Sequence, residues 1–143
     1  MSIRFRSLSL LAALLVLSGV DAAEVPGRKA GLWETKIKVN GTTLLSQTCV
    51  DATSEAAARA KKDAYMKANC SKLDTHQEGA KWVSDSTCTF AGTTVTGHTV
   101  TTIDGDAAIH TTGTTSADSK WLGPCKPGQK PGVPMVMPGS TRN

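Results

Sequence analysis

The sequence predicts an α+β domain: a curved antiparallel β-meander of about six strands, with one helix packed on it and two disulfides. Three observations lead to this prediction. A segment rich in alanine and lysine, typical of a helix, occurs at 52–68, and threonine-rich segments separated by glycine turns follow it. Four cysteines accompany an aromatic content of only 4%, so crosslinks are expected to support a thin core.

The N-terminus has the pattern of a secretory signal peptide at 1–22. Two arginines precede an apolar run, 8–20, that is too short to span a bilayer comfortably. Cleavage after Ala22 would leave 121 of the 143 residues, enough for one domain at 23–125 and a tail at 126–143. No second apolar segment of membrane length follows, so we expect a periplasmic protein without a stable membrane anchor.

The mature chain is expected to begin with a β-hairpin. Residues 32–39 alternate in polarity, and Asn40-Gly41 is the strongest short signal for a type I′ turn. In that register Trp33 faces Thr48 and Ile37 faces Leu44. The predicted core consists of the apolar residues on this face together with one tryptophan further along: Trp33, Ile37, Val39, Leu44 and Trp82.

The segment 52–68 is predicted to be the helix, with Asp51 or Thr53 as its N-cap and Glu55 near the positive end of its dipole. Alanines recur every three or four residues and form a smooth apolar stripe that we expect to pack on the sheet. This stripe consists of Ala57, Ala60, Ala64 and Ala68. The charged run Lys61, Lys62 and Asp63 is expected to face water.

After the helix, glycine turns predict strands at 71–77, 80–90, 93–103 and 106–115. The alternating threonines within them resemble a glycan-binding or ice-binding ladder, but they have no fixed repeat spacing. We interpret them as polar residues suited to exposed strands. The tail at 126–143 is rich in proline and glycine, which predicts an extended or disordered segment.

Cys49, Cys70, Cys88 and Cys125 are even in number and lie in a chain routed to an oxidising compartment, which predicts two disulfides. Their spacing does not suit a zinc site, and no Cys-x-x-Cys occurs. A turn at Glu78-Gly79 would place Cys70 and Cys88 on opposite faces of the sheet and so exclude that pair. Of the two remaining pairings we favour Cys49 with Cys70 and Cys88 with Cys125.

Composition argues against several functions. The formal net charge is +4, without a basic stripe interleaved with aromatics, so nucleic acid is not an expected partner. A turn at Asp104-Gly105 would place His98 and His110 on opposite faces, which disfavours a metal site. Met135 and Met137 alone are too few for a copper(I) site. No motif identifies catalytic or cofactor-binding residues.

The layout of the tryptophans and cysteines resembles a known family. Gly31-Leu32-Trp33-Glu34 opens the mature chain, Trp82 and Cys88 follow, and Trp121-Leu122-Gly123-Pro124-Cys125 ends it. Over about residues 29–132 this layout resembles the domain-of-unknown-function 3617 family of small exported proteobacterial proteins. The resemblance implies a signal peptide, a periplasmic location and cysteines that are disulfide partners. It brings no activity and no functional residues.

These observations favour a non-enzymatic binding or interaction module. A curved sheet under a helix leaves a groove that would take a small apolar ligand or an envelope protein. The alternatives are an enzyme whose site is assembled from dispersed polar residues and a periplasmic metal-handling protein. The sequence assigns no cofactor.

Overall fold

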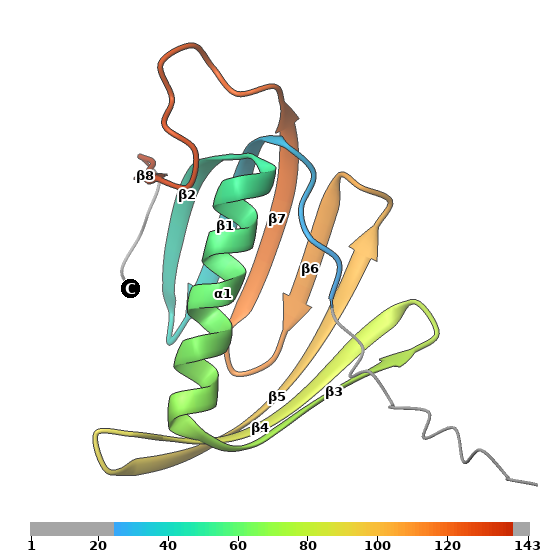
Figure 1. The fold of residues 1–143 in the computed structure, drawn as a ribbon, viewed down its shortest axis with the longest axis vertical. Helices are drawn as coiled ribbons and strands as arrows, with labels where there is room; N and C mark the ends of the chain where they lie inside the picture. The colour runs from blue at the N-terminus through green and yellow to red at the C-terminus, as the bar shows by residue number, and fades with distance from the viewer. Residues whose placement is uncertain (1–24, 139–143) are drawn as a thin grey trace, which may run out of the picture.

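The computed structural model describes residues 25–138, and the predicted signal peptide lies outside this range. Within it, one antiparallel sheet of eight strands has the order β3-β4-β5-β6-β7-β1-β2-β8. Figure 1 shows α1 crossing one face of this twisted sheet, while the segment before β1 runs beside β6. No helix in the described part is long and apolar enough to cross a membrane.

The first hairpin confirms the predicted turn and register. Strands β1 (Gly31–Val39) and β2 (Thr42–Val50) pair with Ile37 opposite Leu44 and Trp33 opposite Thr48. Both turn residues have positive φ, 47° at Asn40 and 76° at Gly41, as a type I′ turn requires.

Helix α1 (Ala52–Asn69) also matches its predicted span, and Asp51 is its N-cap. The Asp51 carboxylate accepts a hydrogen bond from the Ser54 backbone N–H at 2.7 Å, and the Ser54 hydroxyl accepts one from the Asp51 N–H at 2.9 Å. This reciprocal pair satisfies two donors at the start of the helix. At its other end the chain turns directly from α1 into β3 at Cys70.

The predicted packing face of the helix is wrong. The four alanines of the stripe are exposed, and no residue of α1 is buried. The residues turned towards the sheet are instead long and mostly charged, because the sheet surface opposite them is polar. The helix therefore lies above the sheet without packing tightly against it.

The sheet has two more strands than expected. The four strands predicted after the helix are β3 (Cys70–Glu78), β4 (Lys81–Phe90), β5 (Thr93–Asp104) and β6 (Ala108–Thr112). Strand β7 (Ser116–Gly123) then pairs with β1, and β8 (Pro134–Val136) pairs with β2. The tail is thus ordered at 134–136 as a short edge strand, where a proline is tolerated as the first residue.

The core lies at one end of the first hairpin and around the cysteines. The buried apolar residues are Leu32, Trp33, Cys49, Val50, Val83 and Cys88. Of the five predicted core residues, Trp33 is 1% exposed, Ile37 and Trp82 are partly exposed, and Val39 and Leu44 are each 38% exposed. The last two lie near the turn, whereas the Cys49–Cys125 disulfide and the loop after it cover the other end of the hairpin.

Two disulfides are present, as predicted, but they join Cys49 to Cys125 and Cys70 to Cys88. This is the pairing that the register argument excluded. The β3–β4 turn falls at 79–80, and a β-bulge at Ser71 inserts one residue into β3. Because one extra residue reverses the faces of a strand, Cys70 lies directly opposite Cys88. Two disulfides indicate an oxidising compartment outside the cytoplasm.

The disulfide pairing can be tested by stability measurements. The crosslinks span 76 and 18 residues. In the chain-entropy model they stabilise the fold by about 4.5 and about 3 kcal/mol respectively. The double substitution C49A/C125A should therefore lower the free energy of unfolding in urea more than C70A/C88A does. Non-reducing peptide mapping should recover Cys49 linked to Cys125, and a peptide linking Cys49 to Cys70 would contradict the structure.

Candidate binding cleft between α1 and the sheet

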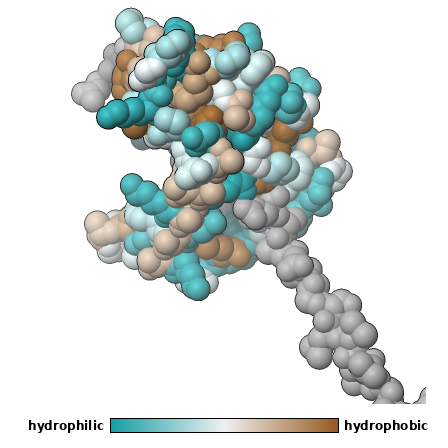
Figure 2. Space-filling view, turned by 45° about the horizontal axis from the view of Figure 1, so that its top comes forward, coloured by the Kyte–Doolittle hydropathy of each residue, from teal (hydrophilic) through white to brown (hydrophobic). Residues whose placement is uncertain are grey.

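Because α1 does not pack tightly on the sheet, a cleft lies between the helix and the sheet. One part, of about 440 Å³, is bounded by α1, by β4, β5 and β6, and by residues 25–28 before β1. A second part, of about 510 Å³, extends it towards β3. Both parts are lined by Lys62, Asp63, Ser84 and Thr99, so they form one elongated space. The outline of the molecule is notched on one side, and polar and apolar residues mix over this view without a large apolar patch (Figure 2).

Much of the sheet side of the cleft is lined by hydroxyl groups that we call the hydroxyl band, with Ile109 and Leu73 beside them. Its members come from four neighbouring strands and are all partly buried: Thr75, Ser84, Thr99, Thr101 and Thr111. Cross-strand register places them together, since Thr75 faces Ser84, Ser84 faces Thr99, and Thr101 faces Thr111. Directly opposite residues share a face of the sheet. Of the threonines interpreted above as exposed strand residues, Thr99, Thr101 and Thr111 thus gather on one partly buried surface, whereas Thr94 and Thr96 are exposed as predicted.

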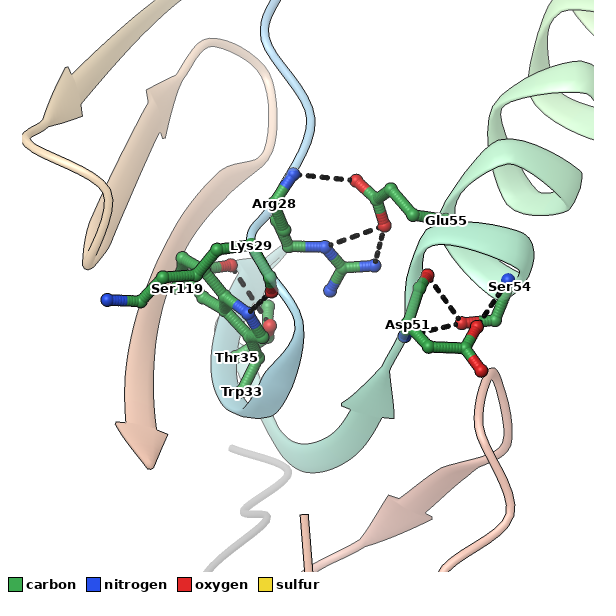
Figure 3. Close-up of polar contacts among 8 residues, drawn as sticks. All are labelled: Arg28, Lys29, Trp33, Thr35, Asp51, Ser54, Glu55 and Ser119. Carbon is green, nitrogen blue, oxygen red and sulfur yellow. Dashed lines mark hydrogen bonds and ion pairs between the residues drawn. The ribbon is translucent and has the colours of Figure 1, made fainter. Parts of the chain in front are cut away.

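Hydrogen bonds connect the hydroxyl band. The hydroxyls of Thr75 and Ser84 lie 2.7 Å apart, and those of Thr101 and Thr111 lie 3.1 Å apart. A further pair, Thr35 and Ser119, continues the same face beyond the cleft at 3.0 Å (Figure 3). The hydroxyl groups are held in place by their neighbours, and each pair retains unused donor and acceptor capacity.

The helix side of the cleft is charged. Residues of one α1 face line it at helical spacing: Glu55, Arg59, Lys62, Asp63 and Met66. Lys62 and Asp63 are exposed, as predicted, and both also border the open cleft. Within residues 25–138 neither side chain has a hydrogen-bond or ion-pair partner. A cation and a carboxylate are therefore available side by side at the middle of the cleft.

The segment before β1 forms one end of the cleft and is anchored by Arg28. The Arg28 guanidinium donates hydrogen bonds of 3.1 and 2.8 Å to one Glu55 oxygen, and the Arg28 backbone N–H donates one of 3.0 Å to the other (Figure 3). Partial burial acts to raise the pKa of Glu55, but the hydrogen bonds and charge of Arg28, with the charge of Arg59, outweigh it and hold this pKa below its ordinary value. Glu55 is therefore ionised at neutral pH.

Two tryptophans anchor the rest of this segment. The Trp33 indole N–H donates to the Lys29 carbonyl at 2.9 Å, and the Trp121 N–H donates to the Ala30 carbonyl at 3.1 Å. The Lys29 ammonium lies 3.8 Å from the centre of a Trp121 ring and 3.0 Å from an Asp106 carboxylate oxygen. These contacts fix where the segment enters the cleft.

The three histidines lie on the opposite face of the sheet. The β5–β6 loop contains three residues, so Thr102 faces His110, and His98 shares that face; the predicted divergence of His98 and His110 is wrong. Each histidine is instead paired with a carboxylate of its own, with His98 2.8 Å from Asp85 and His110 2.9 Å from Asp118. His76 lies 3.0 Å from Glu78. No group of three or more potential ligands occurs within the described range.

The sequence-predicted site residues, the four cysteines, are all crosslinked and line little of the cleft. Cys70–Cys88 lies where α1 meets β3, and Cys49–Cys125 lies at the far end of the hairpin. They position the cleft without forming its surface. The one sequence signal that could have pointed to the cleft is the alternation of threonine in 93–115, which was interpreted as exposed strands.

Replacing Glu55 by Gln should lower the free energy of unfolding at pH 7 by about 1 kcal/mol, because Arg28 loses a charged partner at a partly exposed site. Because the Glu55 pKa is lowered in the folded state, the ionised carboxylate stabilises the fold at neutral pH. This stabilisation is lost as the pH falls and the carboxylate becomes protonated. The difference between wild type and E55Q should therefore shrink between about pH 5 and pH 3 in urea unfolding. Asp104→Asn is the control, and an E55Q difference that is constant with pH would contradict the assignment.

Comparison with known proteins gives one match. A family model described as "Protein of unknown function (DUF3617)" matches residues 28–125, which is 98 of the 143 residues. The match begins at Arg28 and ends at Cys125, so it includes both disulfides, the pairing of β1 with β7 and all of the cleft lining except Val25 and Pro26. No curated protein and no solved structure matches the chain. The chain belongs to the DUF3617 family.

Proposed function

We propose that this protein is an exported binding module that holds a polar small molecule in the cleft between α1 and the sheet, without transforming it. The observation that carries the proposal is the hydroxyl band. A helix over a sheet ordinarily buries apolar side chains between the two layers. Here hydroxyl groups of four strands line that space instead, and α1 contributes no buried residue.

The size and chemistry of the cleft support binding. Each of its two parts falls within the range of about 300–1,000 Å³ typical of small-molecule sites. Hydroxyl groups donate and accept hydrogen bonds, and partial burial strengthens the bonds that they make to a ligand. Polar groups in such a space favour a ligand that can pair with them. The proposal therefore takes a polar ligand in place of the apolar one that the sequence suggested.

The titratable groups of the cleft favour binding over catalysis. A general acid at neutral pH needs a raised carboxyl pKa. The pKa of Glu55 is lowered, and its oxygens are occupied by Arg28. The histidines, the residues best suited to proton transfer near pH 7, lie on the other face of the sheet.

The periplasm is the compartment that we propose for this activity. The disulfides support a location outside the cytoplasm, and the predicted signal peptide at 1–22 supports export. Cell fractionation followed by N-terminal sequencing should find the protein in the periplasm with Ala23 as its first residue. Recovery of the uncleaved chain from the cytoplasm would contradict this proposal.

A cleft-filling substitution tests the binding function. Ala58 lines the cleft, whereas Ala56 is exposed on the other side of α1, so Ala58→Trp and Ala56→Trp form a matched pair. In ligand-observed NMR with a library of polar metabolites, some compounds should bind the wild type and A56W but not A58W. Binding that A58W leaves unchanged, or no binding to the wild type, would contradict the proposal. New signals from converted compounds would identify an enzyme.

A further inference from the structure

We infer that the ligand of the cleft is a short saccharide chain lying lengthwise between α1 and the sheet. This inference rests on the proposed function and names the ligand class. Four observations support it: the chemistry of the hydroxyl band, the occupied backbone of the cleft floor, the length of the cleft, and the unpaired polar groups around it.

The hydroxyl band is complementary to a polyol. In each bonded pair, Thr75 with Ser84 and Thr101 with Thr111, one O–H donates to its neighbour. The second O–H and the remaining lone pairs are left for a ligand. Saccharide hydroxyls offer the same mixture of donors and acceptors. An apolar ligand would cover these groups without replacing their bonds to water, which is unfavourable.

The backbone of the floor argues against a peptide ligand. An extended peptide commonly binds by adding a strand to a free sheet edge. Strands β4, β5 and β6 each pair with a neighbour on both sides, so their N–H and C=O groups are occupied within the sheet. At β4, β5 and β6 recognition must therefore use side chains, which are mainly hydroxyls, whereas β3 is the edge strand of the sheet and is open on one side.

The cleft is long enough for several linked sugars. Its floor crosses four strands, β3 to β6. Neighbouring strands lie about 4.8 Å apart, so the floor extends over roughly 15 Å. This length exceeds one pyranose ring, and the two parts of the cleft share Lys62 and Asp63 as lining residues.

The unpaired polar groups around the cleft suit a ligand that both donates and accepts hydrogen bonds. The Lys62 ammonium can donate to ring and hydroxyl oxygens, and the Asp63 carboxylate can accept from two adjacent hydroxyls. A simple anion would be repelled by the negative charge of Asp63.

The test is isothermal titration of the mature chain, 23–143, with three saccharides: maltotriose, triacetylchitotriose and trigalacturonate. Laurate and trialanine serve as apolar and peptide probes. Two double variants of β5 form a matched pair. T99V/T101V removes two hydroxyls from the cleft, and T96V/T102V removes two from the opposite face of the same strand. Valine keeps the branched shape of threonine in both.

At least one saccharide should bind the wild type. T99V/T101V should weaken that binding about tenfold or more through the loss of two hydrogen bonds. T96V/T102V should leave it within about twofold, and both double variants should unfold cooperatively in urea. Saccharide binding that T99V/T101V leaves unchanged would overturn the inference. Binding of trialanine alone, abolished by A58W, would overturn the saccharide ligand but keep the proposed binding of a polar molecule. Binding of laurate alone would overturn both. Absence of binding by every probe, together with a failed metabolite screen, would overturn both.

Discussion

The pairing of β1 with β7 is the contact on which the rest of the structure depends. It joins segments about ninety residues apart in the chain, with Leu32 opposite Gly123 and Trp33 opposite Trp121. The fit is close: a Cβ at residue 31 would overlap the Trp121 indole nitrogen and the Gly123 carbonyl, and Gly31 has a φ of 136° that disfavours other residues. This junction links the first hairpin to the strands that follow α1, and so makes one sheet of two parts.

The same junction explains why a cleft exists. It fixes the segment before β1 where Arg28 meets Glu55, near the start of α1. At the other end of the helix, the chain enters β3 through Cys70, which is bonded to β4 through Cys88. The helix is therefore attached at both ends and does not rely on buried side chains between them. A helix held in this way can leave polar groups beneath it accessible to a ligand.

Local signals in the sequence predicted the elements that depend on neighbouring residues. Asn40-Gly41 determined the turn and register of the first hairpin, and Asp51 marked the start of the helix. The sequence did not predict features that depend on the exact number of residues in a strand or a loop. The bulge at Ser71 changed the disulfide pairing, and the third residue of the β5–β6 loop changed the face of His110. Neither insertion has a distinctive residue type.

The candidate site was hidden for a related reason. The hydroxyl band runs across strands, so its members on neighbouring strands are separated by nine to fifteen residues along the chain and show no regular repeat. The helix face was misjudged because alanine spacing indicates an apolar stripe but not which surface lies opposite it. Only the assembled sheet shows that this surface is polar.

Strand β8 has a consequence for how the molecules behave when crowded together. The long edge of β2 would otherwise offer a row of free amide and carbonyl groups to another chain. The three residues of β8 cover part of that edge, and their proline contributes no N–H of its own. At this edge β8 therefore limits pairing with a second molecule, whereas β3, at the opposite edge of the sheet, stays open to such pairing.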